Sequence, residues 1–379
     1  MIKVAIIGCG KMADQHAVQI QRIPGAEIVA VCDSETLMAR QLSERFGVNR
    51  YFTSEREMFD TVKVDVVHVT TPPASHFHLG KAALNAGCHV YIEKPFTLNT
   101  PEAVDLIELA NQKGLKVMAG HNAQFTHVML QMRELVNSGY LGGKPVHMES
   151  HYCYDLGDAS YAKALLGDSA HWARKLPGSL LQNIISHGIS KIAEFLSGDN
   201  PVVIAHGFTS PFLKSIGQDD IIDEVRVIIR DEDSTTAYFT FSSQIKPVPH
   251  QLRLYGPKNS LIVDDDHQIL IKIGNDDYKS YLRYFLPPLG YAKQYAANFT
   301  RNAGKFITKD FHLPNDAALK TLIESFYDSI VGNVPLPLSH REILLTTRIM
   351  DDIFTQIKQP CPGTGLARKT YPCCQNSHY

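Results

Sequence analysis

The sequence has few of the features that mark membrane, secreted or nucleic-acid-binding proteins. No stretch of about 18 consecutive apolar residues occurs, so we expect no membrane-spanning helix. The 37 basic and 39 acidic residues leave a net charge of -2, which excludes a general attraction to nucleic acid or acidic lipid. The opening "MIKVAIIGCG" resembles a β-strand rather than a signal peptide. We therefore predict a cytoplasmic protein that binds no nucleic acid.

Cysteine is also used sparsely. The seven cysteines are an odd number, which argues against a framework of disulfides. Cys9, Cys32 and Cys88 fall inside strand-like runs, and this placement indicates buried, reduced thiols. Cys373 and Cys374 are adjacent near the end of the chain, but two thiols supply too few ligands for a metal site. We predict no bound metal.

Strands and helices alternate through the first third of the chain. Runs rich in β-branched apolar residues, such as "VDVVHVT", are separated by helical patterns such as Glu35 to Phe46. Strands that are apolar throughout and separated by helices indicate a parallel sheet covered on both faces. Because 379 residues are too many for one ordinary core, we predict two domains, the first a doubly wound α/β domain over residues 1–122.

The pattern changes after this domain. A helix beginning near Val128 leads into strand-like runs from "PVHMESHYCY" to "QILIKI", and five of them follow one another with short, turn-like connections. Such connections favour an antiparallel sheet. Two helices follow, and Ser339 with Glu342 forms a capping box for the last. We predict a second α/β domain over residues 123–357 and a disordered tail over residues 358–379.

The first strand runs into a glycine motif that is typical of dinucleotide sites. The stretch from Gly8 to Ala13 fits G-x-G-x-x-G/A, and it includes Cys9, Gly10, Lys11 and Met12. Gly8 permits a tight turn, Gly10 lets the backbone approach a pyrophosphate, and the following helix N-terminus faces the phosphate charge. The alternative, a glycine turn without a ligand, does not explain the acidic residue described next.

Asp33 ends the second strand, 23 residues after Gly10. Its carboxylate can accept hydrogen bonds from both hydroxyls of an adenosine ribose and would repel a 2'-phosphate. This favours NAD, although Ser34 and Arg40 nearby leave NADP open. Thr71, Pro72 and Pro73 end the next strand, where they either line the cofactor cleft or form only a rigid loop.

The stretch "HVYIEKPFTLN" ends an apolar strand on Glu93, Lys94 and Pro95. The carboxyl end of a strand in a nucleotide-binding sheet is where ligands dock, and Pro95 keeps Lys94 out of helical geometry. Together with "AIIGCGKMA", "TPPASHFHLGKAALNAGCHVYIEKP" and "NSGYLGGKPVHMES", this block resembles the glucose-fructose oxidoreductase, inositol dehydrogenase and MocA-like (Gfo/Idh/MocA) family. The resemblance extends to about residue 357.

The resemblance implies a fold, an activity and a catalytic lysine. It implies an N-terminal Rossmann domain and a C-terminal α/β domain with a large, mainly antiparallel open sheet that forms homodimers or homotetramers. Most members oxidise or reduce a secondary alcohol of a sugar or cyclitol at the nicotinamide, and their motif lysine, here Lys94, contacts the reacting hydroxyl. The resemblance also adds His76 to the cofactor contacts. Glu93 orients the lysine or the cofactor, or satisfies nearby backbone donors.

A second family signature, Gly-Gly-x-x-x-Asp-x-Gly-x-His, resembles "PGSLLQNIISHGIS". Ser179 stands at the second glycine, Asn183 replaces the aspartate, Ile185 replaces the third glycine, and His187 is retained. Asn183 and His187 are four residues apart, so one helix would place both on one face. We predict that His187 takes the alcohol proton and that Asn183 binds a sugar hydroxyl. Alone, such a histidine would suggest a buried structural residue.

Further candidates lie on either side of this helix. The cationic cluster formed by Arg174 and Lys175 beside Trp172 either holds the phosphate of a substrate or is a solvated helix end. His121 and Asn122 follow the last strand of the first domain and either line the cleft or form a hinge.

Three functions compete for this pattern. The leading prediction is an NAD-dependent oxidoreductase acting on a nucleotide-linked or phosphorylated sugar. The alternatives are an NAD-dependent glycosidase working by transient oxidation and elimination, and a cofactor-binding regulator that has lost catalysis. An amphipathic helix after Pro288 is predicted to cover the sheet or an oligomer interface rather than to touch a membrane surface.

Overall fold

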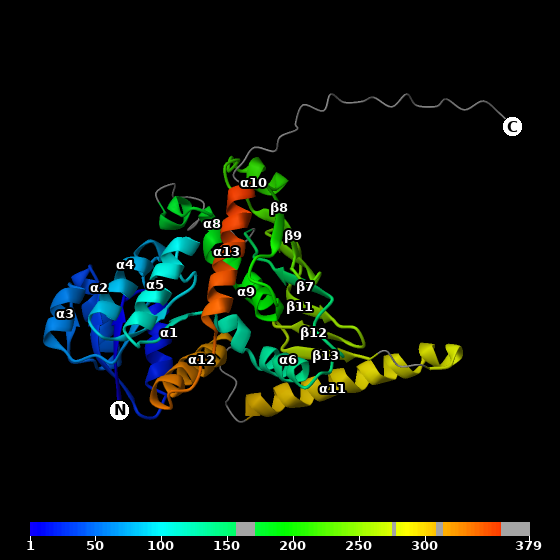
Figure 1. Cartoon of the computed structure of the whole chain (residues 1–379), viewed down its shortest axis with the longest axis horizontal. Helices are drawn as coiled ribbons and strands as arrows, with labels where there is room; N and C mark the ends of the chain where they lie inside the picture. The colour runs from blue at the N-terminus through cyan, green and yellow to red at the C-terminus, as the bar shows by residue number, and fades with distance from the viewer. Residues whose placement is uncertain (157–170, 275–277, 308–313, 358–379) are drawn as a thin grey trace.

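The computed structural model describes residues 1–156, 171–274, 278–307 and 314–357. It contains two sheets, each with helices packed against it, and helix α13 (His340–Ile357) runs between them (Figure 1). The predicted tail, with Cys373 and Cys374, lies outside the described residues.

The first sheet is the parallel sheet that the sequence predicts. Its six strands have the order β3-β2-β1-β4-β5-β6, and every neighbouring pair is parallel. The central strand β4 is fully buried because helices cover both faces of the sheet. The strands are β1 (Ile2–Ile7), β2 (Ala26–Cys32), β3 (Tyr51–Phe52), β4 (Val66–Val69), β5 (His89–Ile92) and β6 (Val117–Ala119).

Two helices of this domain, α3 and α5, begin at side-chain caps. The Asn99 side chain accepts a hydrogen bond from the Glu102 N–H at 3.0 Å and starts α5. Ser54 caps α3, which sequence analysis missed together with β3 because both elements are too short to give a clear periodicity. The helices are α1 (Lys11–Ile20), α2 (Thr36–Phe46), α3 (Glu55–Thr61), α4 (His76–Asn85) and α5 (Thr100–Gln112).

The second sheet is mainly antiparallel, as predicted, with one exception. Its seven strands have the order β13-β12-β11-β7-β10-β9-β8, and β7 and β10 are parallel. Strand β7 lies between β10 and β11, so the consecutive runs do not form one uninterrupted meander. The strands are β7 (His147–Tyr152), β8 (Val202–Phe208), β9 (Glu224–Arg230), β10 (Thr236–Ser242), β11 (His250–Tyr255), β12 (Ser260–Asp264) and β13 (Ile269–Ile273).

Helices cover one face of this sheet. Ile189 and Ile192 of α9, Ile353 of α13 and Phe239 of the sheet belong to one buried core. The opposite face carries exposed apolar side chains, including Ile204, Ile228 and Tyr238. The helices of this half are α6 (His127–Asn137), α8 (Ser179–Ile184), α9 (Ser186–Phe195) and α10 (Pro211–Ser215).

Two helices from the end of the chain join the halves. Leu322 and Phe326 of α12 (Pro314–Val331) share a buried core with Ile6 and Ala17 of the first domain. Helix α13 begins after Ser339, whose Oγ accepts from the Glu342 N–H at 3.2 Å, as predicted for the cap. The first domain is therefore completed by a helix that lies far from it in the sequence.

Helix α11 (Leu286–Ile307) runs along the edge of the second sheet and extends beyond it (Figure 1). It begins two residues before Pro288. Proline is tolerated at this point because the first turn of a helix does not need its backbone N–H. The side-chain amides of Asn298 and Gln294 bond to the backbones of Leu270 and Lys272 on edge strand β13. This covers a strand edge that would otherwise be open to pairing. No described helix is long and apolar enough to cross a membrane.

Candidate active site

The glycine motif leaves room for a dinucleotide at the start of α1. Gly8 has φ +94°, and a Cβ at this position would lie 2.6 Å from Thr71 Cγ2, so only glycine fits. A Cβ at Gly10 would meet no atom within 4 Å, which leaves open space where the helix N-terminus begins. Cys9 is buried, and burial raises the pKa of its thiol to about 12. Cys9 thus contributes backbone rather than a reactive side chain.

Asp33 is held in place by two backbone donors. One carboxylate oxygen accepts from the Cys9 N–H at 2.6 Å and the other from the Glu35 N–H at 2.9 Å. Each oxygen keeps a further lone pair for a ribose hydroxyl. Ser34 is exposed beside it, and the Arg40 guanidinium donates to Glu44 at 2.7 Å. These carboxylate acceptors fit a dinucleotide with a free ribose 2'-hydroxyl. Lys11 is exposed and Met12 half-buried in the first turn of α1.

His76 supports the site rather than facing open space. Its Nδ1 lies 2.8 Å from the Pro95 carbonyl oxygen, and its Nε2 lies 2.9 Å from the Thr71 carbonyl oxygen. The side chain is fully buried and links the loop after β4 to the loop after β5. Pro72 is exposed and Pro73 buried in the same loop. His76 therefore contacts two backbone carbonyls, one in each loop.

Lys94 joins the two domains. It follows β5, and its Nζ donates to the Asn183 backbone oxygen at 2.9 Å and approaches Asn183 Oδ1 at 3.4 Å. Burial lowers the pKa of Lys94, and the negative charge of Glu93 opposes this shift. The predicted lysine and the predicted substrate helix thus meet directly.

The predicted single helix through Asn183 and His187 is wrong. The structure has two helices, α8 and α9, with a turn at Ile185 between them. The Asn183 carbonyl accepts from Lys94 Nζ, and at the junction the Gly188 N–H bonds to the Ile185 carbonyl. In a continuous helix this carbonyl would accept a hydrogen bond from the backbone N–H four residues further on. Here it accepts from the lysine instead.

His187 and His121 provide neutral imidazoles near the lysine. Burial lowers the pKa of His187 well below its usual value, and the positive charge of Lys94 adds to the shift. Burial likewise lowers the pKa of His121 to about 4. His187 Nδ1 is buried and has no hydrogen-bond partner among the described residues, and its ring centroid lies 5.1 Å from that of Tyr152. A buried ring nitrogen without a partner is suited to bind a ligand hydroxyl. Asn122 follows His121 and is half-buried.

The cationic cluster is less available than the sequence suggests. Trp172, Arg174 and Lys175 lie on one short helical turn, η3 (Trp172–Lys175). Arg174 donates to Gln218 Oε1 at 2.9 Å and pairs with Asp220 at 3.3 Å. Trp172 and Lys175 are exposed.

Sequence analysis missed a set of polar residues beneath the site. Glu93 is buried and bonds to His16, which in turn contacts His68. A Cβ at Gly120 would lie 2.9 Å from Glu93 Oε1, so the glycine leaves room for the carboxylate. The one signal in the sequence was His68, a histidine inside an otherwise apolar strand. Within the described ranges, no group of three or more His, Cys, Asp or Glu residues could hold a metal ion.

Comparison with known proteins identifies relatives of both halves. Residues 2–121 match the model of an oxidoreductase family with an NAD-binding Rossmann fold, and residues 129–262 match a GFO/IDH/MocA C-terminal domain. The chain is 36% identical over 142 residues to D-glucoside 3-dehydrogenase of Escherichia coli, which covers 37% of this chain and 40% of that protein. It is 26% identical over 206 residues to glycosyl hydrolase family 109 protein 2 of a Shewanella species, covering 52% of this chain and 44% of that protein. These matches span less than half of each relative.

Solved structures share the fold over nearly the whole chain. The WlbA dehydrogenase from Bordetella pertussis, in complex with NADH and UDP-GlcNAcA, aligns with a TM-score of 0.75 and 15% identity over 94% of this chain and 95% of that chain. UDP-N-acetylglucosamine 3-dehydrogenase from Acidithiobacillus ferrooxidans aligns with a TM-score of 0.68 and 18% identity over 94% and 98%. With the glycine loop, the Glu-Lys-Pro loop and both domain matches in agreement, the chain belongs to the Gfo/Idh/MocA oxidoreductase family.

Proposed function

We propose that this protein is an NAD-dependent oxidoreductase that transfers hydride between the nicotinamide and a secondary hydroxyl or keto group of a sugar derivative. The observation that carries the proposal is the contact between Lys94, at the end of a nucleotide-domain strand, and Asn183 of the second domain. Burial lowers the pKa of His187, and the charge of Lys94 lies close enough to add to this shift, which keeps the imidazole neutral. Its buried Nδ1 has no hydrogen-bond partner among the described residues. These are the groups that alcohol oxidation needs beside a dinucleotide.

In oxidation, the residues of this chain divide the work of handling the alcohol. The bound nicotinamide supplies the acceptor for the hydride. The Lys94 ammonium donates a hydrogen bond to the alcohol oxygen and stabilises negative charge that develops there. His187 takes the hydroxyl proton, since its lowered pKa keeps it neutral at physiological pH. In the reverse reaction His187 returns that proton to the oxygen of the ketone as hydride arrives.

The substrate class that we favour is a nucleotide sugar or sugar phosphate. Support comes from solved proteins of the same fold whose names include UDP-sugars. Exposed Lys175 and Trp172 could meet such an anionic group, whereas Arg174 would first have to leave Asp220. The test is to measure NADH or NADPH formation with NAD and with NADP on a panel of nucleotide sugars, sugar phosphates and free sugars. We expect turnover with an anionic sugar and NAD; turnover with free sugars alone would overturn this preference.

A second candidate function is glycoside cleavage through transient oxidation. The observation favouring it is the match to glycosyl hydrolase family 109 proteins over 206 residues. Incubation of the NAD-loaded protein with glycosides separates the two functions. Net accumulation of NADH supports the dehydrogenase, and cleavage without net NADH supports the glycosidase.

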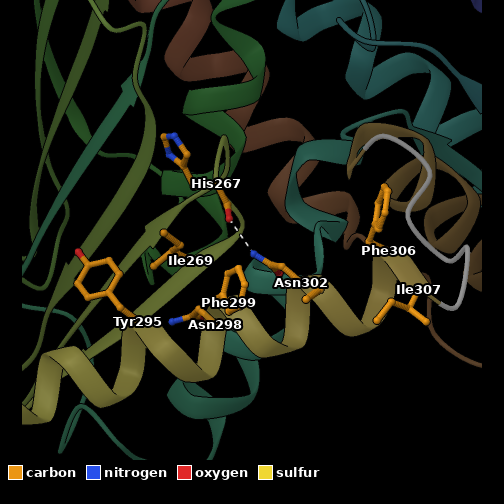
Figure 2. A pocket seen from close by; sticks show the side chains of 9 residues that line it. His267, Ile269, Tyr295, Asn298, Phe299, Asn302, Phe306 and Ile307 are labelled. Carbon is orange, nitrogen blue, oxygen red and sulfur yellow. Dashed lines mark hydrogen bonds between the residues drawn. The ribbon is translucent and has the colours of Figure 1, made fainter.

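We further propose that two copies of the chain associate through the exposed face of the second sheet. Ile204, Ile228 and Tyr238 are neighbours across β8, β9 and β10, and they form a continuous apolar row with about half of each side chain exposed. An exposed apolar row across the last three strands of the sheet fits a second copy of the same row across a two-fold axis. The groove on α11, of about 610 Å³, is a separate apolar surface lined by Phe299, Phe306 and other residues (Figure 2).

A further inference from the structure

A chain of buried hydrogen bonds runs through the first domain from the lysine loop to α12. Glu93 Oε1 lies 2.9 Å from His16 Nε2, and His16 Nδ1 lies 2.8 Å from His68 Nδ1. His68 Nε2 lies 2.8 Å from the hydroxyl of Tyr327. These four residues are at most 5% exposed, so solvent does not compete for the bonds. They come from α1, β4, the end of β5 and α12.

The carboxylate at one end orders the protons along this chain when each ring carries a single proton. An ionised carboxylate only accepts hydrogen bonds, so His16 carries a proton on Nε2. With one proton per ring, His16 accepts at Nδ1, so His68 donates from its own Nδ1 and accepts at Nε2. Tyr327 is therefore the donor that completes the series. Burial lowers the pKa of His68 far below its usual value, in agreement with a neutral ring, and hydrogen bonding to His16 helps to keep the pKa of Glu93 low.

Glu93 is also bonded to the lysine residue itself. Its Oε2 accepts from the Lys94 backbone N–H at 3.1 Å, so the carboxylate holds the backbone from which the catalytic side chain projects. The charge of Glu93 raises the pKa values of Lys94, His121 and His76 against the effect of burial. The position where the family signature has an aspartate is Asn183 here. Glu93 thus supplies a negative charge close to Lys94, whereas the neutral Asn183 supplies none.

We infer that Tyr327, His68 and His16 are positioning residues that hold Glu93 ionised and aligned under Lys94, so that helix α12 forms part of the support of the active site. This inference rests on the proposed oxidoreductase function. It assigns a role to Tyr327, which belongs to neither the glycine loop nor the Glu-Lys-Pro motif. Loss of the Tyr327 hydroxyl leaves the buried Nε2 of His68 without a donor, which weakens the series of hydrogen bonds that holds the Glu93 carboxylate.

The chain offers a matched pair of variants to test this inference. Tyr327→Phe removes the donor at the end of the series, whereas Tyr91→Phe removes a buried hydroxyl that has no hydrogen-bond partner among the described residues. The ring of Tyr91 stacks on His68 at 4.8 Å, so both variants alter the same cluster by one oxygen. We expect Tyr327→Phe to lower kcat roughly tenfold with little change in KM or in the Kd for NAD, because one hydrogen bond is lost. Tyr91→Phe should retain kcat.

Histidine ring-nitrogen NMR provides a readout that does not depend on turnover. In the wild-type protein and in Tyr91→Phe, His16 should be protonated on Nε2 and His68 on Nδ1, and in Tyr327→Phe the ring-nitrogen resonances of His16 should shift because the weakened series reaches Glu93. Equal kcat in the two variants, or unchanged His16 resonances in Tyr327→Phe, would overturn the inference. A wild-type protein with the expected tautomers but no turnover on any sugar would instead count against the proposed function.

Discussion

Asn183 lies beside Lys94 without adding a negative charge. Its backbone and side-chain oxygens both lie near Lys94 Nζ, but neither carries a negative charge. Burial therefore lowers the pKa of the lysine with only Glu93 opposing it. The protein is expected to work with a lysine that loses its proton more easily than an exposed one.

Asn183→Asp tests this account of the lysine. A carboxylate beside Nζ favours the charged form, so the pKa of Lys94 should rise and the pH profile of kcat should move to higher pH, by about one unit. The control is Asn85→Asp, which makes the same change at an exposed asparagine of α4 and should leave the profile unchanged. A profile that does not move in Asn183→Asp would show that Lys94 does not set the pH dependence.

The site residues that could be predicted from sequence are those fixed by short motifs. Gly8, Asp33 and Lys94 follow strands at spacings that the chemistry of the dinucleotide requires. The contact of Lys94 with the Asn183 carbonyl could not be predicted, because it depends on how two domains meet. His16 and His68 gave no pattern either, since a buried hydrogen-bond chain has no sequence period.

At the scale of elements, α8 begins with a strained residue. Ser179 has φ +50°, a left-handed conformation that costs residues with a Cβ about 1 kcal/mol or more. The family signature has glycine at this position, and the structure gives the reason. Gly178 before it is required by packing, since a Cβ there would lie 2.5 Å from the Phe354 ring.

Ser179→Gly should therefore stabilise the protein. Relief of the left-handed strain outweighs the greater freedom of glycine in the unfolded chain, so the free energy of unfolding should rise by about 0.5–1 kcal/mol. Ser138→Gly is the control, because Ser138 has φ -77° and gains nothing from glycine. Denaturant unfolding measures both; a loss of stability in Ser179→Gly would contradict the strain argument.

Most elements follow from local pattern, and the exceptions arise from long-range contacts. The apolar strands and the cap at Ser339 were readable because they depend on neighbouring residues. The break at Ile185 depends on Lys94, and the parallel pairing of β7 with β10 depends on the order of the whole sheet. The packing of α12 on the first domain likewise depends on residues far away in the chain.

At the scale of the whole molecule, two apolar surfaces compete as interfaces. The row on the second sheet includes Ile228, and the groove on α11 includes Phe299, whose side chain is 72% exposed (Figure 2). We expect Ile228→Glu to convert a dimer to a monomer because it places a charge inside the proposed interface. Phe299→Glu should leave the mass unchanged. Light scattering on both variants decides, and dissociation by Phe299→Glu alone would move the interface to α11.

The central claim is that Lys94 acts on the substrate beside a bound dinucleotide. The most direct measurement compares Lys94→Ala with Lys81→Ala, an exposed lysine of α4 in the same domain, by NAD titration calorimetry and by turnover with the best sugar of the panel. The account predicts that Lys94→Ala still binds NAD but loses about 100-fold or more in kcat, while Lys81→Ala matches the wild-type protein. Wild-type turnover in Lys94→Ala would contradict it.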